Sequence, residues 1–232
     1  MQYWKNKMQR SHPDSQEATS SGYGLNALLV NVMATVLVLA ALMNTARAND
    51  AKTILALGDS LTAGYGLDQG QAFPVQLQAA LIAAGENVTV INGGVSCDTS
   101  AGGRSRLDWL LARPVDGVIV ELGANDGLRG LDPAQTRENI DWILATLKAR
   151  GVPVLLSGML APPNLGADYV AEFNAIYPDL ARKHDVALDA FFLEGVAANV
   201  HLNQADGIHP NAEGVAIIVK RLIPKVQHLL AR

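Results

Sequence analysis

Cysteine, aromatic residues and positive charge are all scarce in this chain of 232 residues. Cys97 is the only cysteine, which excludes an intramolecular disulfide, and the lack of a CxxC pair or a Cys/His cluster excludes a structural zinc site. Aromatic residues make up 5% and the formal net charge is −4. Base stacking and neutralisation of a phosphate backbone both need more than this, so nucleic acid is not an expected partner.

One long apolar run lies near the N-terminus, at residues 25–43. It follows a polar, positively charged stretch and precedes a small-x-small triplet, Ala-Arg-Ala, that ends at Ala48. This order is typical of a secretory signal peptide. We therefore expect residues 1–48 to be a signal peptide cleaved after Ala48, and residues 49–232 to form a secreted or periplasmic domain without stable membrane association. The alternative is an uncleaved membrane anchor, because the run is long enough to span a bilayer.

Short apolar runs alternate with helical patterns in the rest of the chain. The runs are rich in Val, Ile and Leu, which is typical of strands buried on both faces of a parallel sheet. The expected strands are 53–57, 88–92, 117–122, 152–157 and 186–191. The expected helices are 73–85, 105–112, 133–151, 168–184 and 212–231. Five alternating units predict an α/β fold, a three-layer α/β/α sandwich around a five-stranded parallel sheet.

Polar residues follow the first of these strands at once, in the stretch GDSLTAGYG from Gly58 to Gly66. Ligands of open parallel sheets bind beyond the carboxyl ends of the strands, so this stretch is a candidate site. It has no lysine of the kind that a Walker loop needs, and it does not match the dinucleotide motif GxGxxG. The remaining interpretations are a structural turn and a nucleophilic serine at Ser60.

A serine hydroxyl is a good nucleophile only where a base removes its proton, and histidine is the side chain that titrates near neutral pH. His209 is the strongest candidate for that base, because Asp206 precedes it by three residues, with Gly207 between them. This spacing allows the carboxylate to fix the imidazole tautomer and leaves Nε2 free to face a serine. A capped turn before the last helix explains the same residues without any chemistry, so the spacing alone leaves both interpretations open.

Three motifs, in order along the chain, resemble those of the SGNH, or GDSL, hydrolase family. They are LALGDSLTAGYGL, ELGANDGLRG and DGIHPNAEG, and together they cover nearly all of residues 53–215. The resemblance implies a flavodoxin-like SGNH hydrolase fold and a serine esterase that works through an acyl-enzyme, without a cofactor or a metal ion. It also implies a small-molecule ester as substrate, with a short acyl or aryl group, and extends to thioesters and lysophospholipids.

The same resemblance assigns roles to five residues. Ser60 is expected to be the nucleophile, His209 the general base and then the general acid, and Asp206 the residue that orients His209. The oxyanion hole is expected to consist of the backbone N–H groups of Ser60 and Cys97 and the side-chain amide of Asn125. An amide N–H is a hydrogen-bond donor at every pH, which suits it to a developing oxyanion. The structural alternative for Asn125 is an Asx turn after the third strand.

Cys97 departs from the family pattern, in which Ser-Gly-Asp-Thr stands where this chain has Ser-Cys-Asp-Thr. The backbone N–H survives the substitution, but a non-glycine residue at positive φ costs on the order of 1 kcal/mol. We therefore expect a working enzyme that is slowed or narrowed in its substrate range. Two alternatives are a catalytically inactive binding module of the same fold and a hydrolase that uses the Cys97 thiol with His209.

The loop at residues 159–169 is expected to bound the acyl pocket, with Leu160 and Leu165 lining it. A surface hinge is the structural alternative for this loop. Because loops rather than motifs set the acyl pocket, the motifs leave a carbohydrate O-acetyl esterase open as an alternative activity, and they carry no information on the oligomeric state.

Overall fold

The computed structural model describes residues 29–30, 32–35 and 51–231. The described residues of the predicted signal peptide, 29–30 and 32–35, are helical, and the expected cleavage position after Ala48 lies outside the described residues. The chain consists of two compact units, which are residues 1–49 and residues 50–232. In the part of the chain that the structure describes, no helix is both long enough and apolar enough to cross a bilayer.

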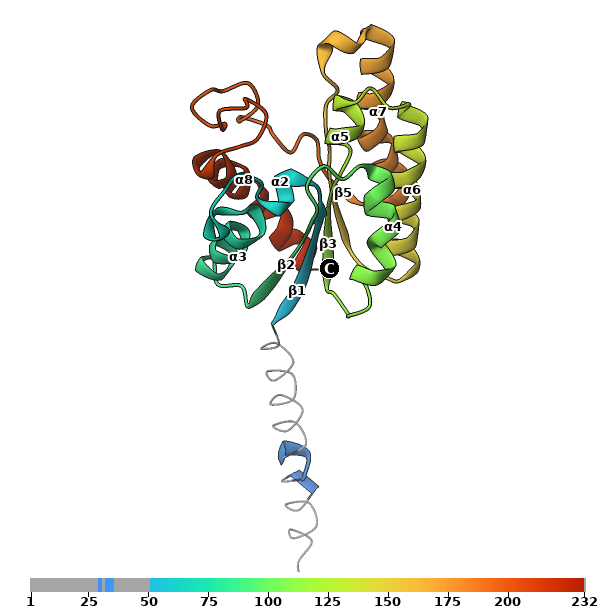
Figure 1. Cartoon of the computed structure of the whole chain (residues 1–232). Helices are drawn as coiled ribbons and strands as arrows, with labels where there is room; N and C mark the ends of the chain where they lie inside the picture. The colour runs from blue at the N-terminus through green and yellow to red at the C-terminus, as the bar shows by residue number, and fades with distance from the viewer. Residues whose placement is uncertain (1–28, 31, 36–50, 232) are drawn as a thin grey trace, which may run out of the picture. The chain divides into compact units, whose positions relative to one another are not determined.

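Five parallel strands form the sheet of the second unit (Figure 1). Their spatial order is β2 (Val88–Gly94), β1 (Lys52–Gly58), β3 (Gly117–Glu121), β4 (Val154–Ser157) and β5 (Ala187–Asp189). The predicted α/β class and the five-stranded parallel sheet are confirmed. The direction of strand addition reverses between β1 and β3, and the carboxyl ends beside such a switch point are where open α/β sheets bind their ligands.

Helices cover both faces of the sheet, as the three-layer prediction requires (Figure 1). One layer contains α3 (Phe73–Ala83) and α8 (Ala212–Leu230), and the other contains α4 (Ser100–Leu110), α6 (Pro133–Ala149) and α7 (Ala167–His184). The start of α4 was predicted at residue 105 and lies at Ser100. The Thr99 side chain caps this helix by accepting a hydrogen bond from the Gly102 N–H at 3.4 Å.

The hydrophobic core centres on the three inner strands, where residues such as Ile54, Ile119 and Leu155 are fully buried. The two edge strands differ from the prediction that every strand is buried on both faces. In β2, Thr89 and Asn92 are exposed, and two of the three residues of β5 are half-buried. β2 and β5 are the edge strands of the sheet, and their residues are less completely buried than those of the inner strands.

The short helix α2 (Ser60–Ala63) follows β1 and approaches the end of β2 so closely that Gly94 must be a glycine. A Cβ added to Gly94 would lie 2.2 Å from the backbone nitrogen of Ala63 and 2.7 Å from its Cα. Both of these atoms belong to the backbone, so rotation of a side chain cannot relieve the clash. The close approach therefore fixes α2 against the sheet.

Gly94→Ala is expected to lower the free energy of unfolding by about 2 kcal/mol, because overpacking in a well-packed site typically costs about 1–3 kcal/mol. Gly70→Ala is the matched control, since a Cβ at Gly70 meets no atom within 4 Å. Denaturant midpoints of the two variants measure the difference. Equal midpoints would contradict the close packing of α2 against β2.

Candidate active site

Ser60 is the first residue of α2, at the carboxyl end of β1. The Asp59 side chain caps this helix by accepting a hydrogen bond from the Leu61 N–H at 3.0 Å, and Gly64 ends the helix in the left-handed conformation. The first N–H groups of a helix have no partner within it, so the backbone N–H of Ser60 is not used by α2. Ser60 is 8% exposed, which leaves its side chain in contact with the cavity described below.

A continuous line of hydrogen bonds joins Ser60, His209 and Asp206. Nε2 of His209 lies 2.9 Å from Ser60 Oγ, and Nδ1 lies 2.7 Å from Asp206 Oδ2. An ionised carboxylate only accepts hydrogen bonds, so it places the ring proton on Nδ1 and leaves Nε2 to accept the proton of Ser60. The structure therefore brings together the three residues that the sequence singled out, although Ser60 lies near the start of the domain's sequence and Asp206 and His209 lie near its end.

Asp206 is held in its ionised form. Hydrogen bonds from the backbone N–H groups of His209 and Ile208 and from the His209 ring lower the pKa of Asp206 to about 2. Both backbone bonds reach Asp206 Oδ1 at 3.0 Å. The carboxylate is therefore charged at neutral pH and can stabilise an imidazolium on the same ring.

Two further side chains hold His209 in place. The Tyr65 ring lies beside the imidazole, with 4.7 Å between the ring centroids. The amide of Gln204 donates to the backbone carbonyls of Tyr65 and Pro210 at 2.8 and 3.0 Å, which ties the histidine loop to the turn after α2. Neither residue was predicted from the sequence, although Tyr65 lies inside the stretch GDSLTAGYG.

Asn125 lies on α5 (Ala124–Leu128), the short helix that follows β3. Its Nδ2 donates to Asp59 Oδ2 at 3.1 Å. Ser60, Cys97 and Asn125 all line one cavity of about 420 Å³. The three residues that were expected to form an oxyanion hole therefore line the same cavity.

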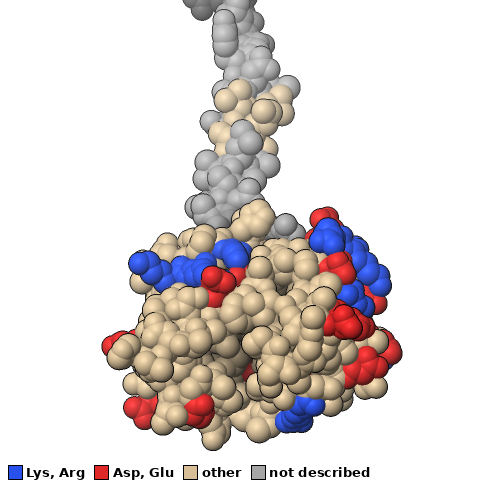
Figure 2. All heavy atoms as spheres, turned by 90° about the horizontal axis from the view of Figure 1, so that it is seen from above, with Lys and Arg blue, Asp and Glu red and all other residues tan. Residues whose placement is uncertain are grey.

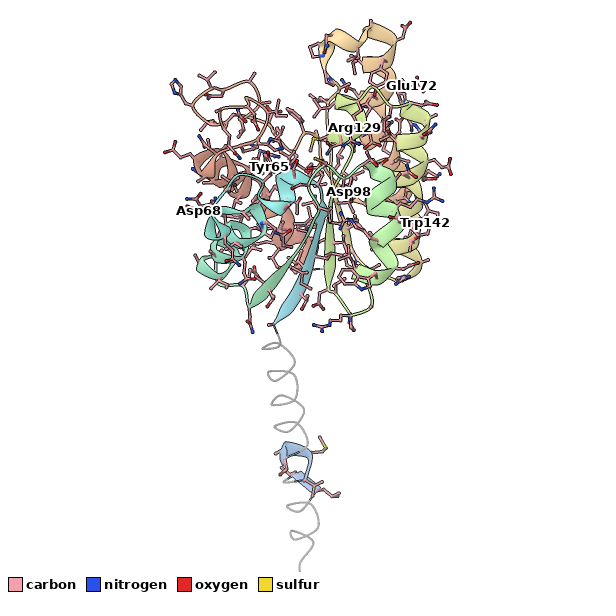
Figure 3. The ribbon with its side chains drawn as sticks, viewed as in Figure 1. Tyr65, Asp68, Asp98, Arg129, Trp142 and Glu172 are labelled. Carbon is pink, nitrogen blue, oxygen red and sulfur yellow. The ribbon has the colours of Figure 1, made fainter. Side chains whose placement is uncertain are left out.

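Cys97 adopts the left-handed conformation, with φ at 67°, and its side chain is exposed. Its backbone carbonyl accepts a hydrogen bond from Arg129 Nη2 at 2.9 Å, which ties the loop to the end of α5. Figure 3 places Arg129 and Asp98 together with Tyr65 at this end of the sheet. Glycine is favoured at positive φ because it has no Cβ. Cys97 therefore has the strained backbone conformation that was considered for it from the sequence.

Cys97→Gly is expected to raise the free energy of unfolding by up to about 1 kcal/mol, because glycine adopts positive φ without the steric cost of a Cβ. Cys97→Ala is the matched control, since it removes the thiol and keeps the Cβ. Equilibrium unfolding in denaturant compares the two. A glycine variant no more stable than the alanine variant would show that the Cβ carries no strain at this position.

The cavity is mostly apolar. Its lining includes Tyr65, Leu128, Met159, Leu160, Phe191 and Ile208. Figure 2, which looks onto this end of the domain, shows a largely uncharged surface that is hollowed near its centre, with charged side chains gathered toward its edges. In the described part of the chain, no group of three His, Cys, Asp or Glu side chains is arranged to hold a metal ion.

The two predicted lining leucines have different positions. Leu160 lines the cavity, whereas Leu165 does not, so the prediction is wrong for Leu165. The chain forms a short 3₁₀ helix at Pro163–Leu165, which carries Leu165 toward Gly130 instead. Several lining residues come from residues 193–203, a segment without regular periodicity that gave no signal in the sequence.

Comparison with known proteins agrees with this geometry. A model described as the GDSL-like lipase/acylhydrolase family matches residues 56–217. The chain is 41% identical over 181 residues to esterase TesA of Pseudomonas aeruginosa, covering 78% of this chain and 90% of that protein. It is 42% identical over 189 residues to thioesterase 1/protease 1/lysophospholipase L1 of Escherichia coli, covering 79% of this chain and 89% of that protein. The protein in the crystal structure of AlinE4, an SGNH-hydrolase family esterase, is 49% identical in sequence to this chain. The two structures match with a TM-score of 0.66 over 78% of this chain and 97% of AlinE4. The chain therefore belongs to the GDSL-like lipase/acylhydrolase family, the SGNH hydrolases.

Proposed function

We propose that this chain is a serine esterase that hydrolyses small-molecule carboxylic esters through an acyl-enzyme. The observation that carries the proposal is the line of hydrogen bonds from Asp206 through His209 to Ser60, at 2.7 and 2.9 Å, beside an apolar cavity. Curated relatives named esterase and thioesterase support the same reaction class.

In the acylation step, Ser60 Oγ attacks the ester carbonyl carbon while His209 Nε2 takes the hydroxyl proton. The carbonyl oxygen becomes an oxyanion, which accepts hydrogen bonds from the backbone N–H groups of Ser60 and Cys97 and from the Asn125 amide. When the tetrahedral intermediate collapses, the ester C–O bond breaks and the imidazolium gives its proton to the leaving alcohol. The acyl group is then bound to Ser60 Oγ.

Deacylation repeats the chemistry with water as the nucleophile. His209 Nε2 removes a proton from the water as its oxygen attacks the acyl carbon, and the same donors hold the second oxyanion. Collapse breaks the bond between the acyl carbon and Ser60 Oγ, and the imidazolium returns its proton to the serine. Throughout, Asp206 keeps its charge and stabilises the cationic ring.

The cavity supports acyl or aryl groups as the part of the substrate that is recognised. Its volume of about 420 Å³ and its apolar lining suit a hydrocarbon chain or an aromatic ring more than a sugar. Short acyl and aryl esters are therefore the first substrates to test. Thioesters and lysophospholipids are the next substrates to test, because one relative is named thioesterase 1 and lysophospholipase L1.

The decisive experiment is covalent labelling with a fluorophosphonate probe, run beside hydrolysis of p-nitrophenyl esters of increasing chain length. We expect the wild type to be labelled and active and Ser60→Ala to lose both properties. A folded wild type that neither labels nor hydrolyses any ester would favour a binding module. Activity retained in Ser60→Ala but lost in Cys97→Ala would favour the thiol-dependent alternative, and a preference for acetylated sugars would favour an O-acetyl esterase.

We also propose that the hydrolase domain is exported and released by cleavage after Ala48. The boundary between the two compact units, after residue 49, supports this proposal, because β1 begins only at Lys52 and cleavage would leave the sheet complete. N-terminal sequencing of the protein from the bacterial periplasm is the test. An intact N-terminus in the membrane fraction would instead support the uncleaved anchor.

A further inference from the structure

Two carboxyl groups that the proposed reaction does not use lie buried beside the nucleophile. Asp59 and Glu121 are both 0% exposed. Glu121 is the last residue of β3 and stands opposite Gly58 in the β1–β3 register. Its side chain therefore lies beside the turn that presents Ser60, although it lines no part of the cavity.

Glu121 accepts hydrogen bonds from residues on both sides of Ser60. Its Oε2 accepts from Thr62 Oγ1 at 2.7 Å and from the backbone N–H of Asp59 at 3.4 Å. A Cβ on Gly58 would lie 2.5 Å from the same oxygen, so the carboxyl group fills the space next to the turn. One oxygen atom thus holds both ends of the short segment that carries the nucleophile.

Asp59 extends this contact to the oxyanion hole. Its Oδ1 caps α2 at the Leu61 N–H, and its Oδ2 accepts from Asn125 Nδ2 at 3.1 Å. A carboxylate accepts and does not donate, so it selects the nitrogen of the Asn125 amide over the oxygen. An amide N–H₂ group has two hydrogens, and the second stays available for the oxyanion.

Burial disfavours the charged form of both carboxyl groups. Burial raises the pKa of Asp59 to about 6, and burial together with the charge of Asp59 raises the pKa of Glu121 well above its usual range. The hydrogen bonds described for both groups come from neutral donors, and Oε1 of Glu121 is buried without a hydrogen-bond partner. A second charge beside the first is costly in such a site, so burial and the Asp59 charge both favour the neutral form of Glu121.

We propose that Glu121 is a positioning residue for the hydrolysis, acting as a hydrogen-bond acceptor that holds the turn of Ser60 and, through Asp59, the amide of Asn125. This inference rests on the proposed function. Glu121 touches no reacting atom, and its effect reaches the nucleophile and the oxyanion donor through Thr62 and Asp59. Misplacement of such groups by about 1 Å can lower a rate by about 10²-fold.

Other ionisable and charged groups surround this pair from several elements. They are Asp98 from the loop before α4, Arg106 of α4, Asp126 of α5, Tyr177 of α7 and His209 from the loop before α8. All of them are unchanged when only Glu121 is substituted. A ratio of rates between a Glu121 variant and the wild type therefore reports the titration of the interacting pair Glu121 and Asp59, because the substitution also changes the charge beside Asp59.

The first test compares Glu121→Gln, which keeps an acceptor oxygen without a charge, with Glu121→Leu, which keeps the approximate size and removes the acceptor. On a p-nitrophenyl ester, we expect the leucine variant to lose about 10- to 100-fold in kcat with KM almost unchanged. The glutamine variant is expected to stay within about threefold of the wild type at neutral pH, since it mimics the neutral acid. Its kcat relative to wild type should then rise with pH, as Glu121 ionises in the wild type only.

Loss of activity in Glu121→Gln equal to that in Glu121→Leu at neutral pH would overturn the proposal, because it would mean that the charge is needed. Wild-type kcat in Glu121→Leu would overturn it as well. Glu86→Gln is the control for a glutamate far from the site, where Glu86 accepts a hydrogen bond from Gln227. It should change neither kcat nor the pH profile.

A second pair of variants keeps the test decisive if Glu121→Leu does not fold. Thr62→Val removes the hydroxyl that donates to Glu121 at nearly constant size, and Thr62→Ser keeps it. We expect kcat to fall about 10-fold in the valine variant and to be closer to the wild type in the serine variant, with KM unchanged in both. Equal kcat values for the two would refute the role of Glu121. An inactive wild type, equally inactive to Ser60→Ala, would instead refute the proposed function.

Discussion

Replacing His209 with glutamine is expected to lower kcat/KM for a p-nitrophenyl ester by on the order of 10⁴-fold, the size of effect that follows when a triad loses its base. The reason is that Ser60 Oγ, 2.9 Å from Nε2 in the structure, then has no group that can take its proton. Steady-state kinetics and the rate of fluorophosphonate labelling measure the loss. Both should fall together, because both begin with attack by the same oxygen.

His201→Gln is the matched control for this variant. His201 is an exposed loop residue that does not line the cavity, so its replacement should leave kcat/KM within about twofold of the wild type, as for a surface substitution away from the site. A His209→Gln enzyme with more than about a tenth of wild-type activity would contradict the proposed base, since general-base catalysis alone contributes at least about 10²-fold.

The loss caused by Asp206→Asn should persist from about pH 5 to about pH 9, because Asp206 is ionised throughout that window. Its hydrogen bonds, the strongest from the backbone N–H of His209, lower its pKa to about 2. A depressed pKa means that Asp206 favours the folded state above its unfolded value of about 3.9, and that this contribution is lost as the pH falls toward 2. A pH–rate profile of the asparagine variant checks this, and a loss that disappears within the window would contradict it.

The sheet and its helices were predictable because each strand is a short apolar run between helical patterns. The start of α4 was not, since Gly102 and Gly103 suggest a loop from the sequence alone. In the structure, a Cβ on Gly103 would lie 2.2 Å from Leu122 Cδ1, so tertiary packing rather than helix propensity places glycine there. The partial exposure of β2 and β5 was missed for a related reason, because apolar content does not identify the strands at the edges.

The proposed catalytic residues were predictable because Ser60 and the pair Asp206 and His209 each lie in a motif whose spacing has a chemical reason. The shape of the cavity was not predictable, since it depends on where residues 191–208 fold over the carboxyl ends of the strands. Glu121 did leave a signal in the sequence. A single acidic residue in the run GVIVEL is unusual in a strand that is buried on both faces, and such a residue calls for a local partner or a neutral state.

Asn125→Ala is expected to lower kcat by about 10²- to 10³-fold with KM almost unchanged, since the lost hydrogen bond forms mainly with the oxyanion of the transition state. Its amide is held by Asp59 Oδ2 at 3.1 Å and lines the same cavity as Ser60. Asn125→Asp is the informative companion. Asn125→Asp preserves the shape of the side chain but replaces the amide donor with an acceptor beside the buried carboxyl of Asp59. The loss of the donor and the added negative charge both disfavour an oxyanion.

The aspartate variant should therefore be at least as impaired in kcat as the alanine variant, and its kcat should recover partly on acidification as the two carboxyl groups take up a proton. These outcomes separate an oxyanion donor from an Asx turn. A residue that only shapes the turn after β3 would show its effect in the thermal midpoint, and Asn125→Asp would be the milder change because aspartate forms the same turn. A milder aspartate variant with wild-type kcat would thus assign Asn125 to the turn, and the oxyanion would then depend on the backbone N–H groups of Ser60 and Cys97.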